Sequence, residues 1–267
     1  MNKKLFRHLE INGGEVSEKD GWLLTLPPTK QGYADAQIDD YGITACPLEG
    51  TGAVLPHIRL PRRHLPYKPN THLSLRARFS HPIGKLQGTA GFGFWNIPFA
   101  DPSIKWPALP QATWFFYGSA PTDLPLSPSS KGQGWFASTL DATTLSAMSM
   151  IPIAPFVLLA NQATLIRKKL WPKVQYRLGV DYAQIEQDVT QWHKYDLIWR
   201  TNGCQFIVDD KLVMDTKQSP QGKLGFVCWI DNQYMILTSR GKIGWGLLPT
   251  KESQWLQISN LEIGSCI

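Results

Sequence analysis

The stretch WHKYDLIWRTNGCQFIVDDKLV, residues 192–213, contains two strand-like runs, rich in aromatic and β-branched residues, on either side of Asn202-Gly203. A type I′ turn needs a positive φ at both of its central residues. Asn-Gly tolerates this best, so the stretch predicts a β-hairpin around that dipeptide. Asp209-Asp210-Lys211 then predicts a second reversal into a third short strand. The whole stretch is therefore expected to form an antiparallel meander.

Similar strand signals recur along the chain. Residues 72–79 alternate apolar and polar side chains with a period of two, as a half-buried strand does. Further strands are expected at residues 22–26, 36–39, 88–96, 111–117, 135–140, 222–232, 234–238 and 255–263. The 20 Pro and 22 Gly are spread over all 267 residues, and no change of composition marks a boundary. We therefore expect one all-β domain over residues 1–267.

Residues 141–180 interrupt the β pattern. Residues 147–160 are almost wholly apolar, and residues 156–170 lack Pro and Gly, so a helical excursion is expected at about 147–175. Arg167, Lys168 and Lys169 would lie in its last turn, where cations suit the helix dipole. Three roles are open for the excursion. Its apolar side could pack on the sandwich, it could close over a binding cleft, or residues 147–177 could make peripheral contact with an anionic membrane.

Composition and charge exclude several classes of function. The net charge of +6 is mostly diffuse and forms no basic stripe with interleaved aromatics, so nucleic acid is not an expected partner. The four cysteines form no CxxC pair, so neither a metal site nor a cofactor is expected. The sequence has no apolar run of 18 residues, and its first residues lack the apolar segment of a signal peptide. A cytoplasmic location is therefore expected, while the oligomeric state stays open.

The chain resembles the concanavalin A-like lectin/glucanase superfamily, in particular the branch around glycoside hydrolase family 16. The resemblance lies in Trp192-His193-Lys194-Tyr195, Trp199, the Asn202-Gly203 turn and residues 206–210, where Asp210 replaces the usual Gly. It covers residues 70–140 and 190–263. It implies a two-sheet jelly-roll sandwich whose concave face binds saccharide. His193 would then have a structural role.

The resemblance also shows what this chain lacks. Retaining glycosidases need two carboxyl groups about 5 Å apart. The family carries them on one strand in an E-x-D-x-E or E-x-D-x-x-E pattern. The equivalent strand here is residues 111–117, which has Gln111, Thr113, Phe115 and Tyr117 on one face and Ala112, Trp114 and Phe116 on the other. No acid lies on either face, so the family's mechanism cannot operate on this strand and a non-catalytic protein is favoured.

Other acids could in principle replace the missing pair. The weak catalytic candidates are Asp101, Asp141 and Asp231, which lie in loops or at strand ends, as does Asp123. Asp is common at such positions because its side chain bonds nearby backbone amides, so turn and capping roles are the alternative. For Asp231-Asn232, a polar contact with a ligand hydroxyl is equally open.

An aromatic-rich ligand site remains as the main functional candidate. Trp offers a flat apolar surface on which sugars and other ring-shaped ligands stack. The candidate ligand-binding residues are Trp95, Asn96, Trp106, Trp114, Tyr117, Trp135, Trp229, Asp231 and Asn232. Half of the aromatic residues are expected between the two sheets instead, and only the strand register decides which half.

Three functions follow from these observations. The first is a non-catalytic or catalytically divergent glucanase-like protein that binds a saccharide or glycoconjugate in an aromatic-lined concave groove. The second is a hydrolase or transferase/cyclase with a rearranged acid pair. The third is a protein that binds a lipid-like or terpenoid-like molecule in an apolar groove. The missing acids favour the first and third, the lack of an export signal weakens the first, and the apolar residues 147–160 favour the third.

Overall fold

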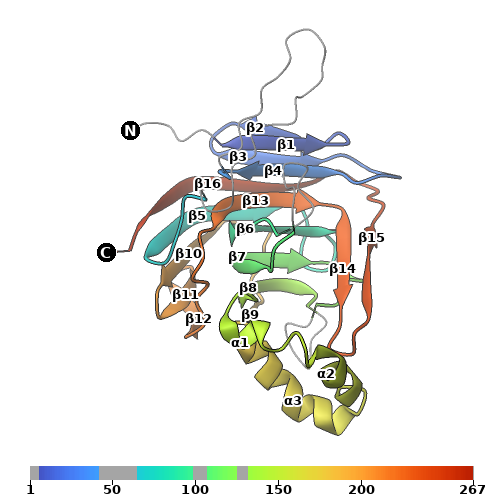
Figure 1. Cartoon of the computed structure of the whole chain (residues 1–267). Helices are drawn as coiled ribbons and strands as arrows, with labels where there is room; N and C mark the ends of the chain where they lie inside the picture. The colour runs from blue at the N-terminus through green and yellow to red at the C-terminus, as the bar shows by residue number, and fades with distance from the viewer. Residues whose placement is uncertain (1–5, 42–64, 99–106, 125–131, 267) are drawn as a thin grey trace.

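The computed structural model describes residues 6–41, 65–98, 107–124 and 132–266. Two antiparallel seven-stranded sheets form a jelly-roll sandwich (Figure 1). The first, called the β7 sheet, has the order β1-β4-β13-β6-β7-β8-β9; the second, called the β10 sheet, has the order β12-β11-β10-β5-β16-β3-β2. The all-β sandwich expected from the sequence is confirmed.

The strands of the β7 sheet are β1 (Arg7–Ile11), β4 (Asp35–Asp39), β6 (Thr89–Trp95), β7 (Gln111–Gly118), β8 (Gly134–Asp141), β9 (Asp181–Ile185) and β13 (Gly225–Asp231). Those of the β10 sheet are β2 (Glu15–Glu18), β3 (Trp22–Leu26), β5 (Thr71–Phe79), β10 (His193–Arg200), β11 (Gly203–Val208), β12 (Lys211–Thr216) and β16 (Gln254–Ser265). A separate hairpin consists of β14 (Gln233–Leu237) and β15 (Ile243–Leu247).

The predicted meander is present as β10, β11 and β12, but its first turn differs from the expected one. Arg200 pairs with Gly203, so Thr201 and Asn202 form the loop and neither has a positive φ. Gly203 instead begins β11, where an added Cβ would lie 2.2 Å from the carbonyl oxygen of Thr216 in β12. The two positive φ values of a type I′ turn occur in the second reversal, at Asp209 (48°) and Asp210 (61°).

The space between the sheets is filled largely by aromatic side chains. Phe92, Phe115 and Trp135 of the β7 sheet contact Tyr195 of the β10 sheet, with ring centroids 5.1, 5.0 and 5.9 Å apart. Phe115 also lies edge-on to Phe206 of β11 at 5.2 Å. Edge-to-face aromatic pairs pack densely and stabilise a core beyond their buried area. Part of the high aromatic content is therefore structural.

The expected helical excursion is present, as three helices: α1 (Leu145–Met148), α2 (Ala154–Ala160) and α3 (Thr164–Arg177). They follow β8 and lie at one end of the β7 sheet (Figure 1). The second half of α3 packs through Trp171 and Val174 against Met150, and Val157 of α2 lies partly buried against the same cluster. Phe156 and Leu159 are 72% and 71% exposed, so the expectation that this apolar side packs on the sandwich is wrong.

Helical residues 156–170 are also not continuous. Residues 161–163 separate α2 from α3, because Asn161 caps α2 and its side-chain amide donates to the carbonyl oxygen of Ser239. None of the described helices is both long enough and apolar enough to cross a membrane.

Candidate functional site

Strand β7 decides which of the candidate residues face outward. Thr113 donates to the sulfur of Cys204 in the opposite sheet at 3.6 Å, so the odd-numbered residues of β7 point into the core. The even-numbered residues therefore point away from the core. On that outer face, β7 presents Trp114 and Phe116.

Four aromatic side chains form one cluster on this outer face, which we call the aromatic row: Trp95 of β6, Trp114 and Phe116 of β7, and Trp229 of β13. Trp95 and Trp114 stack with centroids 4.6 Å apart and an interplanar angle of 21°. Trp114 lies 5.6 Å from Phe116 and 5.3 Å from Trp229. The structure thus brings together three of the predicted ligand-binding residues and adds Phe116.

Two glycines of β6 make room for the aromatic row. An added Cβ on Gly91 would lie 2.8 Å from the Trp229 ring, and one on Gly93 would lie 2.5 Å from the Cα of Trp114. These glycines leave space on the outer face of β6, and neighbouring tryptophans fill it. Without side chains here, β6 lets the rings of its two neighbouring strands approach each other.

Hydrogen bonds fix the orientation of two indoles in the row. The Trp114 indole N–H donates to the Ser138 hydroxyl at 3.1 Å, and the Trp229 indole N–H donates to the Thr89 hydroxyl at 3.1 Å. Phe116 and Trp229 are buried, whereas Trp95 and Trp114 are partly exposed. The row therefore presents a rigid and mainly apolar surface, with its indole N–H donors in Trp114 and Trp229 already paired.

Tyr117 and Trp135 do not belong to this face. Trp135 is fully buried between the sheets, in contact with Phe79 and Phe92. The Tyr117 hydroxyl donates to the carbonyl oxygen of Leu86 at 2.9 Å, and burial raises the pKa of the phenol. Placing these two residues in the ligand site was wrong, because the register gives them odd positions that face the core.

The side chains of the two candidate asparagines form hydrogen bonds with backbone groups of the protein. Asn96 accepts from the Gln111 amide and donates to the carbonyl oxygen of Leu109. The Asn232 oxygen accepts from the Ala34 amide, and its nitrogen donates to the carbonyl oxygens of Gly32 and Leu248. Both are almost fully buried. Their side-chain amides are therefore used within the protein, and the expected contact between Asn232 and a ligand hydroxyl is wrong for this conformation.

Asp231 lies at the end of the outer face, next to the aromatic row. It accepts from the Thr89 hydroxyl at 2.8 Å and from the Gln233 side-chain amide at 2.5 Å, and the same threonine holds Trp229. Burial raises the pKa of Asp231 to about 6, against the hydrogen bonds from Thr89 and Gln233, which lower it. This carboxyl group is therefore easier to protonate than an exposed aspartate.

Sequence reasoning missed a second carboxyl group beside it. Asp35 of β4 is the direct cross-strand partner of Asp231, and both side chains lie on the face opposite the core residues Ala36 and Ile230. Directly paired residues in antiparallel strands have Cβ atoms about 5 Å apart. Each of the two acids is only 1% exposed. The pairing could not be predicted because residues 35 and 231 are far apart in the sequence.

The remaining acid candidates do not reach this site. The Asp141 carboxylate accepts from the Gln111 side chain and from the hydroxyl and amide of Thr143, which is the turn role expected as its alternative. Asp101 and Trp106 lie outside the described residues. Strands β6, β7 and β8 are fully described, and none of them presents a carboxylate on the outer face.

His193 has an acid partner that was not expected. Its Nδ1 lies 2.6 Å from the Asp209 carboxylate, and its Nε2 lies 2.9 Å from the carbonyl oxygen of Asp188. Burial raises the pKa of Asp209, but hydrogen bonds from His193 and from the Lys194 amide outweigh it and leave the pKa lowered. Because Asp209 is also in the type I′ turn, the pair ties β10 to that turn, which fits a structural role.

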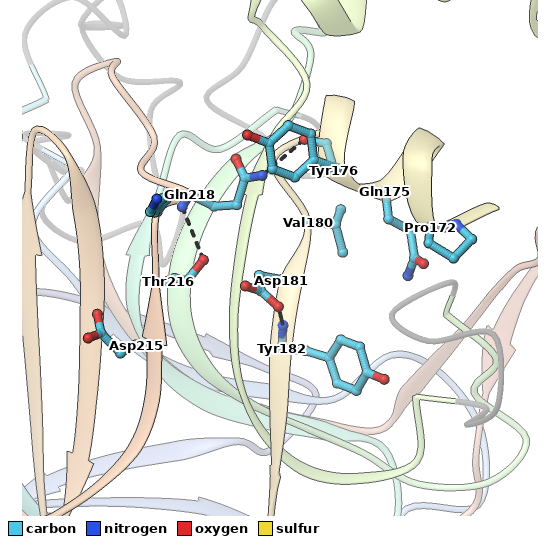
Figure 2. Close-up of a pocket in the computed structure, with 10 residues that line it drawn as sticks. Pro172, Gln175, Tyr176, Val180, Asp181, Tyr182, Asp215, Thr216 and Gln218 are labelled. Atoms are coloured by element: carbon cyan, nitrogen blue, oxygen red, sulfur yellow. Dashed lines mark hydrogen bonds between the residues drawn. The ribbon is translucent and has the colours of Figure 1, made fainter. Parts of the chain in front are cut away.

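A pocket lies apart from the aromatic row, beside the second half of α3. It has a volume of about 470 Å³ and is lined by Pro172, Gln175 and Tyr176 of α3, by residues 180–182 and by residues 215–218. Figure 2 shows Gln218 reaching across to α3, where its amide donates to the carbonyl oxygen of Tyr176 at 3.1 Å. Two carboxyl groups, Asp181 and Asp215, line this pocket, and no member of the aromatic row does.

Comparisons with known proteins bear on the fold only. Neither the protein-family models nor the curated protein sequences give a match to this chain. An endo-β-1,4-glucuronan lyase from the fungus Trichoderma reesei is similar in structure, with a TM-score of 0.47, 9% identity, and coverage of 97% of this chain and 90% of that one. A β-glucanase from Bacillus licheniformis is similar with a TM-score of 0.43 and 8% identity, over 97% of this chain and 94% of that one. A carbohydrate-binding module from Bacillus subtilis is similar with a TM-score of 0.41 and 8% identity, over 97% of this chain and 95% of that one.

These three similar structures include a lyase, a glucanase and a binding module, so they do not single out the glycoside hydrolase family 16 branch. At TM-scores below 0.5, they assign neither an activity nor a ligand.

Proposed function

We propose that this protein binds a saccharide or glycoconjugate along the aromatic row and does not hydrolyse it. The observation that carries the proposal is the cluster of Trp95, Trp114, Phe116 and Trp229 on the outer face of the β7 sheet. Pyranose rings present flat C–H surfaces that pack against aromatic side chains, and ligand sites are commonly lined by aromatic residues with a few polar groups. Ser138 and Thr89 supply polar atoms beside the row.

The position of the carboxyl groups supports binding without hydrolysis. A glycosidase needs an acid and a nucleophile or base on either side of the scissile bond. The outer faces of β6, β7 and β8 carry none. Asp35 and Asp231 are adjacent, but both are buried, and Asp231 is held by hydrogen bonds from Thr89 and Gln233. Asp231 therefore ties the ends of β6 and β13 together, and neither acid is exposed to a glycosidic oxygen.

The proposal is tested with Trp114→Ala and a matched control. Trp255 is also a partly exposed tryptophan, but it lies on the other sheet beneath Arg78, so Trp255→Ala removes an indole away from the row. Binding of neutral and acidic oligosaccharides is measured on a glycan array and then by calorimetry. We expect Trp114→Ala to weaken binding at least about tenfold, since aromatic truncations at binding hot spots cost about 2 kcal/mol or more. We expect Trp255→Ala to leave it unchanged.

Two outcomes would overturn the proposal. If both variants bind as the unmodified protein does, the row is not the site. If the protein releases reducing ends from the oligosaccharide it binds, and Asp231→Asn abolishes that release, the protein is an enzyme with a rearranged acid pair.

A second candidate ligand is a lipid-like or terpenoid-like molecule. It is favoured by one observation, that the indole N–H groups of Trp114 and Trp229 are already paired within the protein. The row then offers mostly apolar surface and few donors for sugar hydroxyls. Thermal shift measurements with farnesol and palmitate distinguish a lipid-like ligand from a saccharide. Only a molecule that binds the folded state raises the melting temperature. A shift with farnesol that Trp114→Ala removes, without any saccharide binding, would establish the second candidate.

A further inference from the structure

The exposed apolar side chains of this protein gather on two segments. Among the described residues, every exposed large hydrophobic side chain except Leu109 and Leu212 belongs to residues 145–176 or 235–247. Single exposed apolar residues are ordinary, whereas a contiguous group of them marks an interaction surface. We call residues 145–176 and 235–247 together the docking surface.

Helix α2 contributes apolar side chains that the protein itself does not cover. Its sequence is APFVLLA, and none of its residues is buried. Phe156 is 72% exposed and Leu159 is 71% exposed. Short helices gain most of their stability from burying an apolar face, and within this chain α2 does so only through Val157, which packs partly buried against Met150 and Trp171. The exposed side chains of Phe156 and Leu159 therefore remain available for contact with another surface.

The β14–β15 hairpin presents a matching apolar face. Met235 pairs with Trp245, and Leu237 pairs with Ile243, so these four side chains lie on the same face of the hairpin. Ile243 and Trp245 are 77% and 74% exposed. Trp is enriched where a protein meets the headgroup region of a bilayer, because its ring is apolar and its N–H is polar.

The two segments meet at the tip of the hairpin. The Asn161 side-chain amide donates to the carbonyl oxygen of Ser239 at 2.8 Å, and that of Gln162 donates to the carbonyl oxygen of Arg240 at 3.1 Å. Figure 1 shows β14 and β15 extending from the sandwich to α2. The exposed groups of the helices and of the hairpin thus belong to one projecting part of the molecule.

The charged side chains within the two segments are all of one sign. No Asp or Glu occurs between Asp141 and Asp181, and none occurs between Asp231 and Glu252. The same intervals contain eight cations, none with an acidic partner among the described residues: Arg167, Lys168, Lys169, Lys173, Arg177, Arg240, Lys242 and Lys251. The partner of the docking surface should therefore have an apolar interior beneath a negatively charged surface.

We propose that the docking surface binds to an anionic lipid bilayer, with the apolar side chains of α2 and the hairpin inserted among the headgroups and the basic residues on the phosphates. A protein that lies in the interface needs this combination of an apolar face and flanking Lys and Arg. A second copy of the chain fits less well, because the two segments themselves supply only cations and like charges repel, although Asp123 pairs with the neighbouring strand β14. The inference is independent of the ligand of the aromatic row.

The test is co-flotation of the full chain with vesicles. The vesicles are phosphatidylcholine alone or a mixture with about one third phosphatidylglycerol. We expect binding at least about tenfold stronger to the anionic vesicles, and weakened when salt rises from about 0.1 M to about 0.5 M. Phe156→Ser/Leu159→Ser/Trp245→Ser and Lys168→Glu/Lys169→Glu/Lys173→Glu should each lower binding at least about tenfold.

Matched controls change the same residue types elsewhere. Leu109→Ser/Leu212→Ser removes the exposed apolar side chains outside the docking surface. Lys30→Glu/Lys85→Glu/Lys223→Glu reverses the charge at three exposed lysines outside it. Both should float as the unmodified protein does, and circular dichroism checks that every variant is folded. The proposal is overturned if the controls lose binding equally or if neither vesicle binds. It is also overturned if sedimentation shows a dimer that the docking-surface variants dissociate, because the partner is then a second copy.

Discussion

Asp231 should make the stability of this protein depend on pH in a direction opposite to that of a salt-bridged aspartate. Burial raises its pKa from 3.8 to about 6 in the folded chain. The carboxyl group thus binds its proton more tightly in the folded than in the unfolded state. Its contribution to stability is fully present below pH 3.8 and is lost as the pH rises through 6. Two pKa units correspond to about 3 kcal/mol, of which about 2 kcal/mol falls between pH 4.5 and 7.5.

The measurement is urea unfolding, followed by tryptophan fluorescence, at several values between pH 4.5 and 7.5. Other groups titrate in this range, so the quantity of interest is the difference in unfolding free energy between the unmodified protein and Asp231→Asn. That difference should fall by about 2 kcal/mol from the lowest to the highest pH, since Asn carries no titrating proton. Asp215→Asn removes an exposed carboxylate and controls for net charge. A difference that stays constant, or that grows with pH, would refute the inferred burial of the charge.

Two further predictions concern buried polar contacts. Asn232→Ala leaves the buried Ala34 amide without its acceptor, so we expect a loss of about 1–3 kcal/mol in urea unfolding. Ligand binding to the aromatic row should not change, and a selective loss of binding would instead make Asn232 a ligand contact. Arg7→Leu removes the guanidinium that donates to the Asp39 carboxylate at 2.7 Å. It should cost about 3–5 kcal/mol, and Arg7→Leu/Asp39→Asn should recover part of that, as a double-mutant cycle would show.

The sequence predicts most of the strands because their side chains alternate or because they are rich in aromatic residues. Strand β5 is the clearest case, with Leu73, Leu75, Ala77 and Phe79 in the core as expected. The missed strands β1, β2, β9 and β15 are short and carry exposed or polar residues, since all four lie at a sheet edge or in the separate hairpin. Their pairing comes from neighbouring strands rather than from a pattern of their own.

The candidate site was predictable in composition but not in orientation. Trp114 and Trp135 occur in similar aromatic strands, yet one faces outward and the other fills the core. A shift of one residue exchanges the two faces of a strand, so only the pairing with neighbours distinguishes them. The contact between Thr113 and Cys204 of the opposite sheet provides that information. It joins residues that are distant in the sequence and cannot be read from either segment alone.

The aromatic row occupies the strand on which the resemblance to glucanases would place acids. Trp114 stands on the outer face of β7, the strand where the resemblance would place acids, and its backbone approaches Gly93 so closely that an added Cβ would lie 2.5 Å from its Cα. Trp229 similarly occupies the space above Gly91. Replacing Trp114 by Glu would therefore place a charge between Trp95 and Phe116, without the polar partners that a catalytic carboxylate needs. The backbone of β6 is fitted to the tryptophans, so an acid at position 114 would lose their packing without gaining a polar partner.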